Sequence, residues 1–342
     1  MIPGPSTPPA GQAVGARGGR LLIFGATLFW GLSATLARFV FRDRHVPPLT
    51  VVELRLALAA LPLGAWLAWR RRERLYVARE DWPGFAVLGI LGLAAVQGSY
   101  YYTISVLGVG LAILIQYLAP SLIVVFDVMR GTRAGGKTIA AVIAALAGTA
   151  LLVGNLDPMA LRATPLQWAI GFSSALSFAF FIVYSKRPLT RYAPETVLFY
   201  TFSTAGVFWA IVTPPWKILA AGYDAEDWGL FLLLAVFSTL VPFSLFYAGL
   251  RRMPAAQVGI IATLEPVVAV VSAAVALGET LRPLQNLGAL LVLAAASLSY
   301  GRAVNSPPSS PPHPDAAMCP RDLVARKPVP APKACAGQPD PP

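Results

Sequence analysis

The longest uncharged run in the chain extends from Trp82 to Phe126. It is about twice as long as the roughly 20 apolar residues that one helix needs to cross the hydrocarbon core of a bilayer. In the whole chain 56% of residues are hydrophobic and 13% are charged, whereas soluble domains carry about 25% charged residues. These features exclude an ordinary soluble enzyme, a disordered chain and a disulfide-linked scaffold, and they predict a polytopic membrane protein.

Ten apolar stretches can be recognised when the uncharged run is divided near Gly108. The predicted fold class is therefore an all-α polytopic membrane protein with ten transmembrane helices. Residues 1–20 are interpreted as a cytoplasmic segment before an uncleaved first helix, and the Pro-rich residues 302–342 as a disordered cytoplasmic tail. The expected spans are 21–41, 48–69, 84–104, 108–128, 137–155, 167–187, 195–214, 229–250, 254–276 and 283–301.

Lys and Arg residues are distributed unevenly among the predicted loops. If the N-terminus is cytoplasmic, the inner loops contain most of them, including the basic stretch Arg70–Arg74 and the pair Arg251-Arg252. Such an excess is typical of the cytoplasmic side of a membrane protein. We therefore predict that both termini are cytoplasmic. The net charge of +11 then reflects topology, and we expect no nucleic-acid partner.

The two halves of the chain share residues at one constant separation of 146 positions. Pro48 matches Pro194, Glu80-Asp81-Trp82 matches Glu226-Asp227-Trp228, Tyr101 matches Tyr247, and Pro120 matches Pro266. These matches predict two five-helix repeats, residues 21–155 and 167–301. Because five is odd, the second repeat must be inverted in the membrane. Inverted repeats are a recurring architecture of secondary transporters, in which the substrate binds near the midplane between the repeats.

The chain resembles EamA-type members of the drug/metabolite transporter superfamily over roughly residues 20–301. The resemblance rests on Trp30-Gly31, Arg55, the stretch from Tyr247 to Arg252, Leu264-Glu265-Pro266, Gly278-Glu279 and Leu287-Gly288-Ala289. Members often have a second Gly-Glu pair after the fourth span, whereas this chain has Arg133 at the position equivalent to Glu279. The resemblance implies a carrier of the bacterial inner membrane that exports amino acids and related metabolites.

Glu265 is the main candidate for a functional residue, because it lies about halfway along the ninth predicted span. A carboxylate at the centre of a bilayer costs about 2.5–3.5 kcal/mol on insertion scales, so its side chain should face the helix bundle. One interpretation is that Glu265 binds a substrate amine or takes up a proton. The alternative is that it stays protonated and forms a hydrogen bond with a neighbouring helix.

Other polar and aromatic residues in the spans are candidates for the substrate cavity. Arg55 either binds a substrate carboxylate or has a structural role, and Arg38 and Glu53 could pair near the outer ends of the first two spans. Pro120 and Pro266 should kink their helices and serve in gating, or bend them statically. The remaining candidates either line the cavity or form interhelical hydrogen bonds: Trp30, Gln97, Tyr101, Gln116, Tyr117, Tyr184, Tyr247 and Gln257.

The expected function is secondary transport by alternating access, with export of amino acids or similar metabolites linked to protons through Glu265. The alternatives are an uncoupled facilitator or exchanger and, less favoured, a lipid scramblase. The expected partners are a small metabolite, the lipid bilayer and protons, and the chain could be a monomer or a homodimer. We expect no enzymatic activity, cofactor or metal site, because no Cys or His lies within the predicted spans. The run 131–138 has Walker A spacing, but it is a short turn between two apolar spans.

Overall fold

The computed structural model describes residues 10–42, 44, 46–107, 109–153, 163–277 and 282–298, and every regular element in these ranges is helical. The first helix begins at Ala10, well before the expected start at residue 21. Residues 10–20 of the predicted N-terminal segment therefore belong to that helix, and residues 1–9 lie outside the described residues. The predicted tail, 302–342, and the pair Gly278-Glu279 also lie outside them.

The first half of the chain forms five helical spans, of which the fourth is interrupted and the third contains a π-helical stretch. In chain order its elements are α1 (Ala10–Arg42), α2 (Pro48–Arg70), the short helices η1 (Arg72–Leu75) and η2 (Arg79–Asp81), α3 (Trp82–Val87), the π-helical η3 (Leu88–Ala94), α4 (Ala95–Leu107), α5 (Val109–Gln116), α6 (Ala119–Met129) and α7 (Gly136–Val153). The uncharged run is divided between α4 and α5, at the predicted position.

The second half repeats this order. Its elements are α8 (Pro165–Arg191), α9 (Pro194–Val212), the short α10 (Pro215–Ala220), α11 (Ala225–Leu234), the π-helical η5 (Ala235–Leu240), α12 (Val241–Leu250), α13 (Ala255–Ala262), α14 (Glu265–Leu277) and α15 (Pro283–Leu298). Several of these helices begin with proline, whose fixed φ angle and missing N–H suit the first helical position.

The two halves agree in their backbone irregularities as well as in their helices. The starts of α2 and α9 are separated by 146 positions, and so are the starts of α5 and α13. A π-helical stretch occurs at equivalent places, in η3 and in η5. The breaks after α5 and after α13 also fall at equivalent residues, Tyr117-Leu118 and Thr263-Leu264. Because π-helices are rare, their recurrence at equivalent places is independent support for an internal repeat.

The helices have the length and composition of membrane spans. Seven helical stretches in the described residues are long and apolar enough to cross a bilayer, α7 and α15 are shorter apolar helices, and α1 covers the first expected span. These match the ten predicted spans in order. The predicted class, an all-helical polytopic membrane protein, is confirmed.

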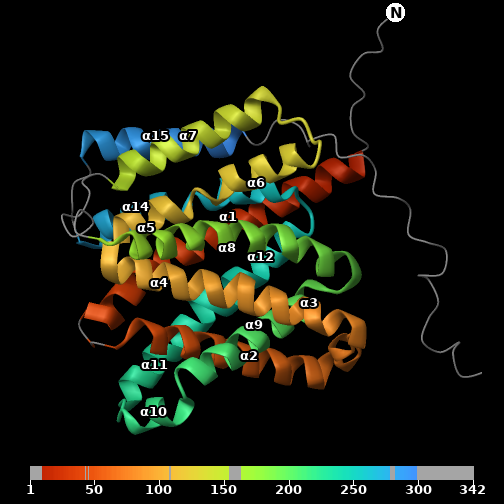
Figure 1. Ribbon diagram of the computed structural model, residues 1–342, viewed down its shortest axis with the longest axis vertical. Coiled ribbons are helices and arrows are strands. Elements are labelled where there is room, and N and C mark those ends of the chain that lie inside the picture. The colour runs from red at the N-terminus through yellow and green to blue at the C-terminus, as the bar shows by residue number, and fades with distance from the viewer. Residues whose placement is uncertain are drawn as a thin grey trace, which may run out of the picture. The chain divides into compact units, whose positions relative to one another are not determined.

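Helices from opposite halves are packed against each other (Figure 1). The first helix of one half contacts the third and fourth spans of the other: α1 packs on α12 and α14, and α8 packs on α4, α5 and α6. Equivalent helices also pair, α2 with α9 and α7 with α15. At the α7–α15 contact, a Cβ atom on Gly148 would lie 2.7 Å from the carbonyl oxygen of Gly288, so this contact requires glycine.

Candidate functional site

The two interrupted spans meet at Glu265. This residue is the first of α14, directly after the break at Thr263-Leu264. Tyr117 is the first residue of the equivalent break in the other half, and its hydroxyl donates a hydrogen bond to Oε2 of Glu265 at 2.7 Å. The site is therefore built from the same irregularity in both halves. The N-terminus of α14 also favours a negative charge in its first turn, through the helix dipole.

Proline accounts for both breaks. Pro120 and Pro266 are each the second residue after a break. Proline cannot donate a backbone hydrogen bond, and its ring clashes with the carbonyl group four residues earlier, which belongs to Gln116 in one half and to Ala262 in the other. Both prolines thus occur where their spans are interrupted, as the sequence predicted for kinks. Whether the breaks move during transport remains a prediction.

Arg55 connects the first half to the π-helical stretch of the second. Its side chain is buried, and its Nε donates to Oγ1 of Thr239 at 2.8 Å. The two terminal nitrogens donate to the hydroxyl of Tyr101 and, at 3.2 Å, to the carbonyl oxygen of Ser238. Within the described residues no carboxylate lies at ion-pair distance from Arg55. The guanidinium group is therefore held by neutral partners, which leaves its positive charge available to an anionic group.

A weaker version of this arrangement occurs at the equivalent place in the second half. Tyr247 is fully buried; its hydroxyl donates to Oγ1 of Thr201 at 3.3 Å and accepts from Ser185 at 3.4 Å. Tyr247 is the repeat partner of Tyr101, and Thr201 is the repeat partner of Arg55. The two halves therefore share a tyrosine paired with a residue of the second helix, but only the first half has a charge there.

Aromatic rings surround these polar groups. The ring of Trp30 packs edge-on against Phe243 at 5.1 Å between centroids and lies 5.5 Å from Phe246. The ring of Tyr100 packs edge-on against Tyr101 at 5.6 Å, and Tyr100 lies within electrostatic range of both Arg55 and Glu265. Arg55 and Glu265 therefore lie in one neighbourhood, and each of them binds a tyrosine, Tyr101 and Tyr117 respectively.

Gly31 brings α1 close to the start of α14. A Cβ atom on Gly31 would lie 2.6 Å from Cβ of Val268 and 2.9 Å from the carbonyl oxygen of Glu265. Contacts this short do not occur, so a larger residue would displace α14 at the residue that carries the carboxylate. The two residues of the pair Trp30-Gly31 thus have different roles. The ring of Trp30 packs in the aromatic cluster, and Gly31 allows the close approach of the α1 and α14 backbones.

The other predicted site residues differ in burial and in position. Gln97 and Gln257 are buried, and Oε1 of Gln116 is buried without a hydrogen-bond partner among the described residues. Tyr184 lies elsewhere: it stacks on Phe180 and borders a 290 Å³ pocket together with Glu80, Asp81, Arg187 and Arg191. Glu53 is buried as well, and its Oε2 has no hydrogen-bond partner among the described residues. The side chain of Arg38, its predicted partner, lies outside the description.

Several residues of the site were not predicted from the sequence. Ser238 and Thr239 bind Arg55, and Thr201 and Ser185 bind Tyr247. Their hydroxyl groups barely change the hydropathy of a span, so composition does not single them out. The repeat offers one usable signal, because adding its offset to Arg55 gives Thr201. Among the described residues, no three His, Cys, Asp or Glu side chains are grouped as metal ligands.

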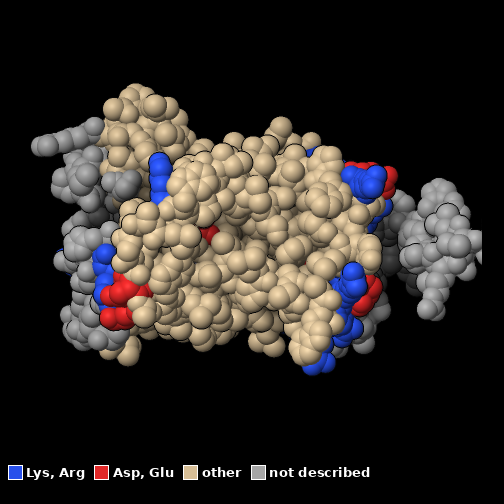
Figure 2. All heavy atoms as spheres, turned by 90° about the horizontal axis from the view of Figure 1, so that it is seen from below, with Lys and Arg blue, Asp and Glu red and all other residues tan. Residues whose placement is uncertain are grey.

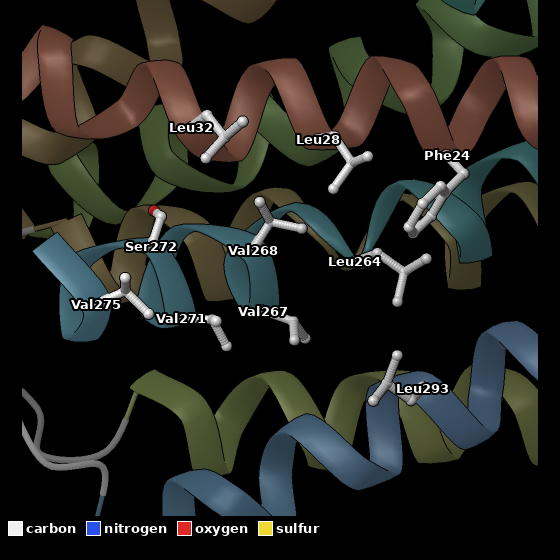
Figure 3. Close-up of a pocket in the computed structure, with 10 residues that line it drawn as sticks. All are labelled: Phe24, Leu28, Leu32, Leu264, Val267, Val268, Val271, Ser272, Val275 and Leu293. Carbon is white, nitrogen blue, oxygen red and sulfur yellow. The ribbon is translucent and has the colours of Figure 1, made fainter.

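An open groove of about 630 Å³ lies between α1, α14 and α15 (Figure 3). It reaches the break before Glu265 through Leu264. Apart from Ser272 its lining is apolar, with Phe24, Leu28 and Leu32 from α1 facing valines of α14. Such a surface suits lipid chains, and it lacks the polar track that passage of a lipid headgroup would need. The residues that line this groove are Phe24, Leu28, Leu32, Leu264, Val267, Val268, Val271, Ser272, Val275 and Leu293.

The fold is that of a polytopic membrane protein with an internal repeat. The model of the EamA-like transporter family matches residues 17–154 and again residues 167–301. The chain therefore belongs to the EamA-like transporter family, as its resemblance had implied.

Related proteins of bacteria have names that agree with this class. The chain is 28% identical over 265 residues to the threonine/homoserine exporter RhtA of Escherichia coli K12, covering 77% of this chain and 84% of that protein. It is 25% identical over 291 residues to the inner membrane transporter YicL of Salmonella typhimurium LT2, covering 82% and 95%. A protein of known crystal structure matches the fold with a TM-score of 0.67 at 21% identity, over 82% of this chain and 96% of that one.

Proposed function

We propose that this protein exports small amino-acid-like metabolites across the bacterial inner membrane by alternating access, and that Glu265 couples export to protons. The single observation that carries the proposal is the Tyr117–Glu265 hydrogen bond, because it joins the two broken spans of the inverted repeats. In transporters with inverted repeats, substrates and coupling ions bind at such discontinuous helices. The names of the relatives support an amino-acid substrate.

Opposite charges in one neighbourhood suit a zwitterionic substrate. Arg55 is buried with neutral partners only, so its charge can interact with a substrate carboxylate. Glu265 accepts one hydrogen bond from a neutral tyrosine, and a substrate ammonium group can compete for that carboxylate. Proton uptake by Glu265 would release the ammonium group, which gives a direct route from proton entry to substrate release.

The proposed topology places both termini in the cytoplasm, so the η1–η2 segment and the α8–α9 connection face the cytoplasm. A fluorescent protein fused to the C-terminus should then fluoresce in cells, whereas an alkaline phosphatase fusion at the same place should be inactive. The reverse pattern would contradict the orientation without affecting the fold.

The proposal is tested with purified protein in liposomes loaded with labelled threonine. An inward proton gradient should accelerate efflux through the wild-type protein, and Glu265→Gln should lose this acceleration. Glu53→Gln is the matched control, because Glu53 is a buried carboxylate at another place in the spans, and it should retain coupled efflux.

The outcomes separate the proposed mechanism from its alternatives. A rate of efflux through the wild-type protein that does not change with the pH gradient would show an uncoupled facilitator or exchanger. Transfer of labelled phospholipid between leaflets without threonine efflux would show a scramblase. Failure of threonine together with a panel of other amino acids would refute the substrate class.

A further inference from the structure

Charged side chains are gathered toward two ends of the helical body, and the wide band between them shows only one small acidic spot on this face (Figure 2). At one end, Arg44 forms ion pairs with Asp224, Glu226 and Asp227. At the other end, Arg191 donates to Oδ1 of Asp81 at 2.9 Å and to Oε1 of Glu80 at 3.3 Å. We name these the Arg44 cluster and the Arg191 cluster.

The two clusters are related by the internal repeat. Glu80-Asp81 and Glu226-Asp227 are repeat partners that begin the third span of each half. Each acidic pair binds an arginine from the connection between the first and second helices of the opposite half, since Arg44 precedes α2 and Arg191 ends α8. Both clusters therefore tie one half of the protein to the other.

The clusters lie at opposite ends of the spans. Arg44 is close to the start of α2, whereas the segment that carries Glu80 and Asp81 follows the end of α2. With 23 residues in α2, these ends are separated by about 35 Å at 1.5 Å per residue. A carrier that opens alternately to the two sides must break contacts between its halves at one end while it keeps them at the other.

The Arg191 end has additional contacts between the halves. The hydroxyl of Tyr192 donates to Oδ2 of Asp81 and accepts from the backbone nitrogen of Ala78. Arg74 pairs with Glu195, and Tyr200 donates to the carbonyl oxygen of Leu75 at 2.6 Å. Within the described residues, the two halves therefore have more contacts at the Arg191 end than at the Arg44 end.

From this geometry we infer that the Arg44 and Arg191 clusters are the two ionic gates of the transporter, each holding its own end closed. The inference rests on the proposed function only in requiring two access states. Ion pairs that are accessible to solvent are individually weak, about 1 kcal/mol or less, and this suits gates that must open in every cycle. Loss of one gate should change the population of the corresponding open state by about fivefold, the equivalent of that energy.

The test measures spin-label distances at both ends in the full chain, with Cys319 and Cys335 replaced by serine. Labels at Ala78 and Thr190 report the Arg191 end, and labels at Leu49 and Gly229 report the Arg44 end. Arg191→Gln should lengthen only the first distance, and Arg44→Gln should lengthen only the second. Each variant is the matched control of the other.

Two further variants separate a gate from a simple stabilising contact. The charge swap Arg191→Asp with Asp81→Arg should restore the wild-type distances. The double variant Glu80→Gln with Asp81→Asn should lengthen the same distance as Arg191→Gln, and it replaces Arg191→Gln in the test if Arg191→Gln folds poorly. Unchanged distances in both single variants, or lengthening at the same end in both, would overturn the inference. Threonine efflux is measured separately, so loss of transport with correct distance changes would refute only the proposed function.

Discussion

Replacing Gly31 by alanine should disturb the site at a place where the structure leaves no room for a methyl group. The added Cβ would lie 2.6 Å from Cβ of Val268 and 2.9 Å from the carbonyl oxygen of Glu265. Ordinary carbon contacts are about 3.5–4.0 Å, so α1 and α14 must separate by about 1 Å. Overpacking of this kind costs about 1–3 kcal/mol, and here the displaced backbone carries Glu265, the carboxylate that we propose for coupling.

Two glycines provide matched controls. Gly148→Ala creates a similar clash at the α7–α15 contact, 2.7 Å from a carbonyl oxygen, but away from Glu265. Gly206→Ala, in α9, meets only Cβ of Leu56 at 3.8 Å, and a helical alanine should be neutral or stabilising by up to about 1 kcal/mol.

The assay compares thermal unfolding in detergent with threonine efflux in liposomes at equal amounts of folded protein. Gly31→Ala and Gly148→Ala should both lower the unfolding temperature, but only Gly31→Ala should reduce efflux per folded molecule by tenfold or more, since small misplacements at a reacting site are costly. Gly206→Ala should match the wild type. If Gly31→Ala also matched the wild type, the close approach of α1 to Glu265 would be refuted.

Three further predictions concern residues around the site and the Arg191 gate. Tyr117→Phe should slow coupled efflux about tenfold, because a hydrogen bond to a charged group contributes about 1.5 kcal/mol or more, and equal rates in the two proteins would count against that bond. Arg55→Lys keeps the charge but cannot make the three contacts of the guanidinium group. The free energy of unfolding, measured by denaturation in mixed micelles, should therefore fall by about 1–3 kcal/mol, and an unchanged value would exclude a structural role of Arg55. Burial and the hydrogen bond to Asp81 raise the pKa of Tyr192, so its contribution to stability should be constant below about pH 10 and be lost as pH rises through the raised value. Tyr192→Phe should lack that alkaline loss in a pH series of unfolding temperatures, whereas the same loss in both proteins would assign it to another group.

The sequence was sufficient for the class and the order of the helices because hydropathy and loop charge determine them. It also predicted kinks at Pro120 and Pro266, next to the places where the structure has helix breaks, since proline acts locally on its own backbone. The π-helical stretches were not predicted, because no single residue type marks them in the sequence. They matter for the site, as η5 supplies both Ser238 and Thr239 to Arg55.

Individual side chains were harder to place than helices. Tyr117 and Glu265 were predicted as separate candidates, and the structure joins them through a contact across 148 positions of the chain. Tyr184 is a tyrosine in an apolar span, as Tyr117 is, yet it lines the pocket beside Arg191. In the sequence, Arg44 and Arg191 are only two of the basic residues in predicted loops, since pairing between repeats cannot be deduced from one chain's hydropathy.

The most direct test of coupling at Glu265 measures proton movement rather than substrate alone. Liposomes containing the protein and a trapped pH-sensitive dye are loaded with threonine and diluted into substrate-free buffer at equal pH. Threonine efflux through the wild-type protein should acidify the lumen, and Glu265→Gln should abolish this signal while Glu53→Gln retains it. Threonine efflux without any acidification in the wild type, or equal acidification with Glu265→Gln, would contradict the account.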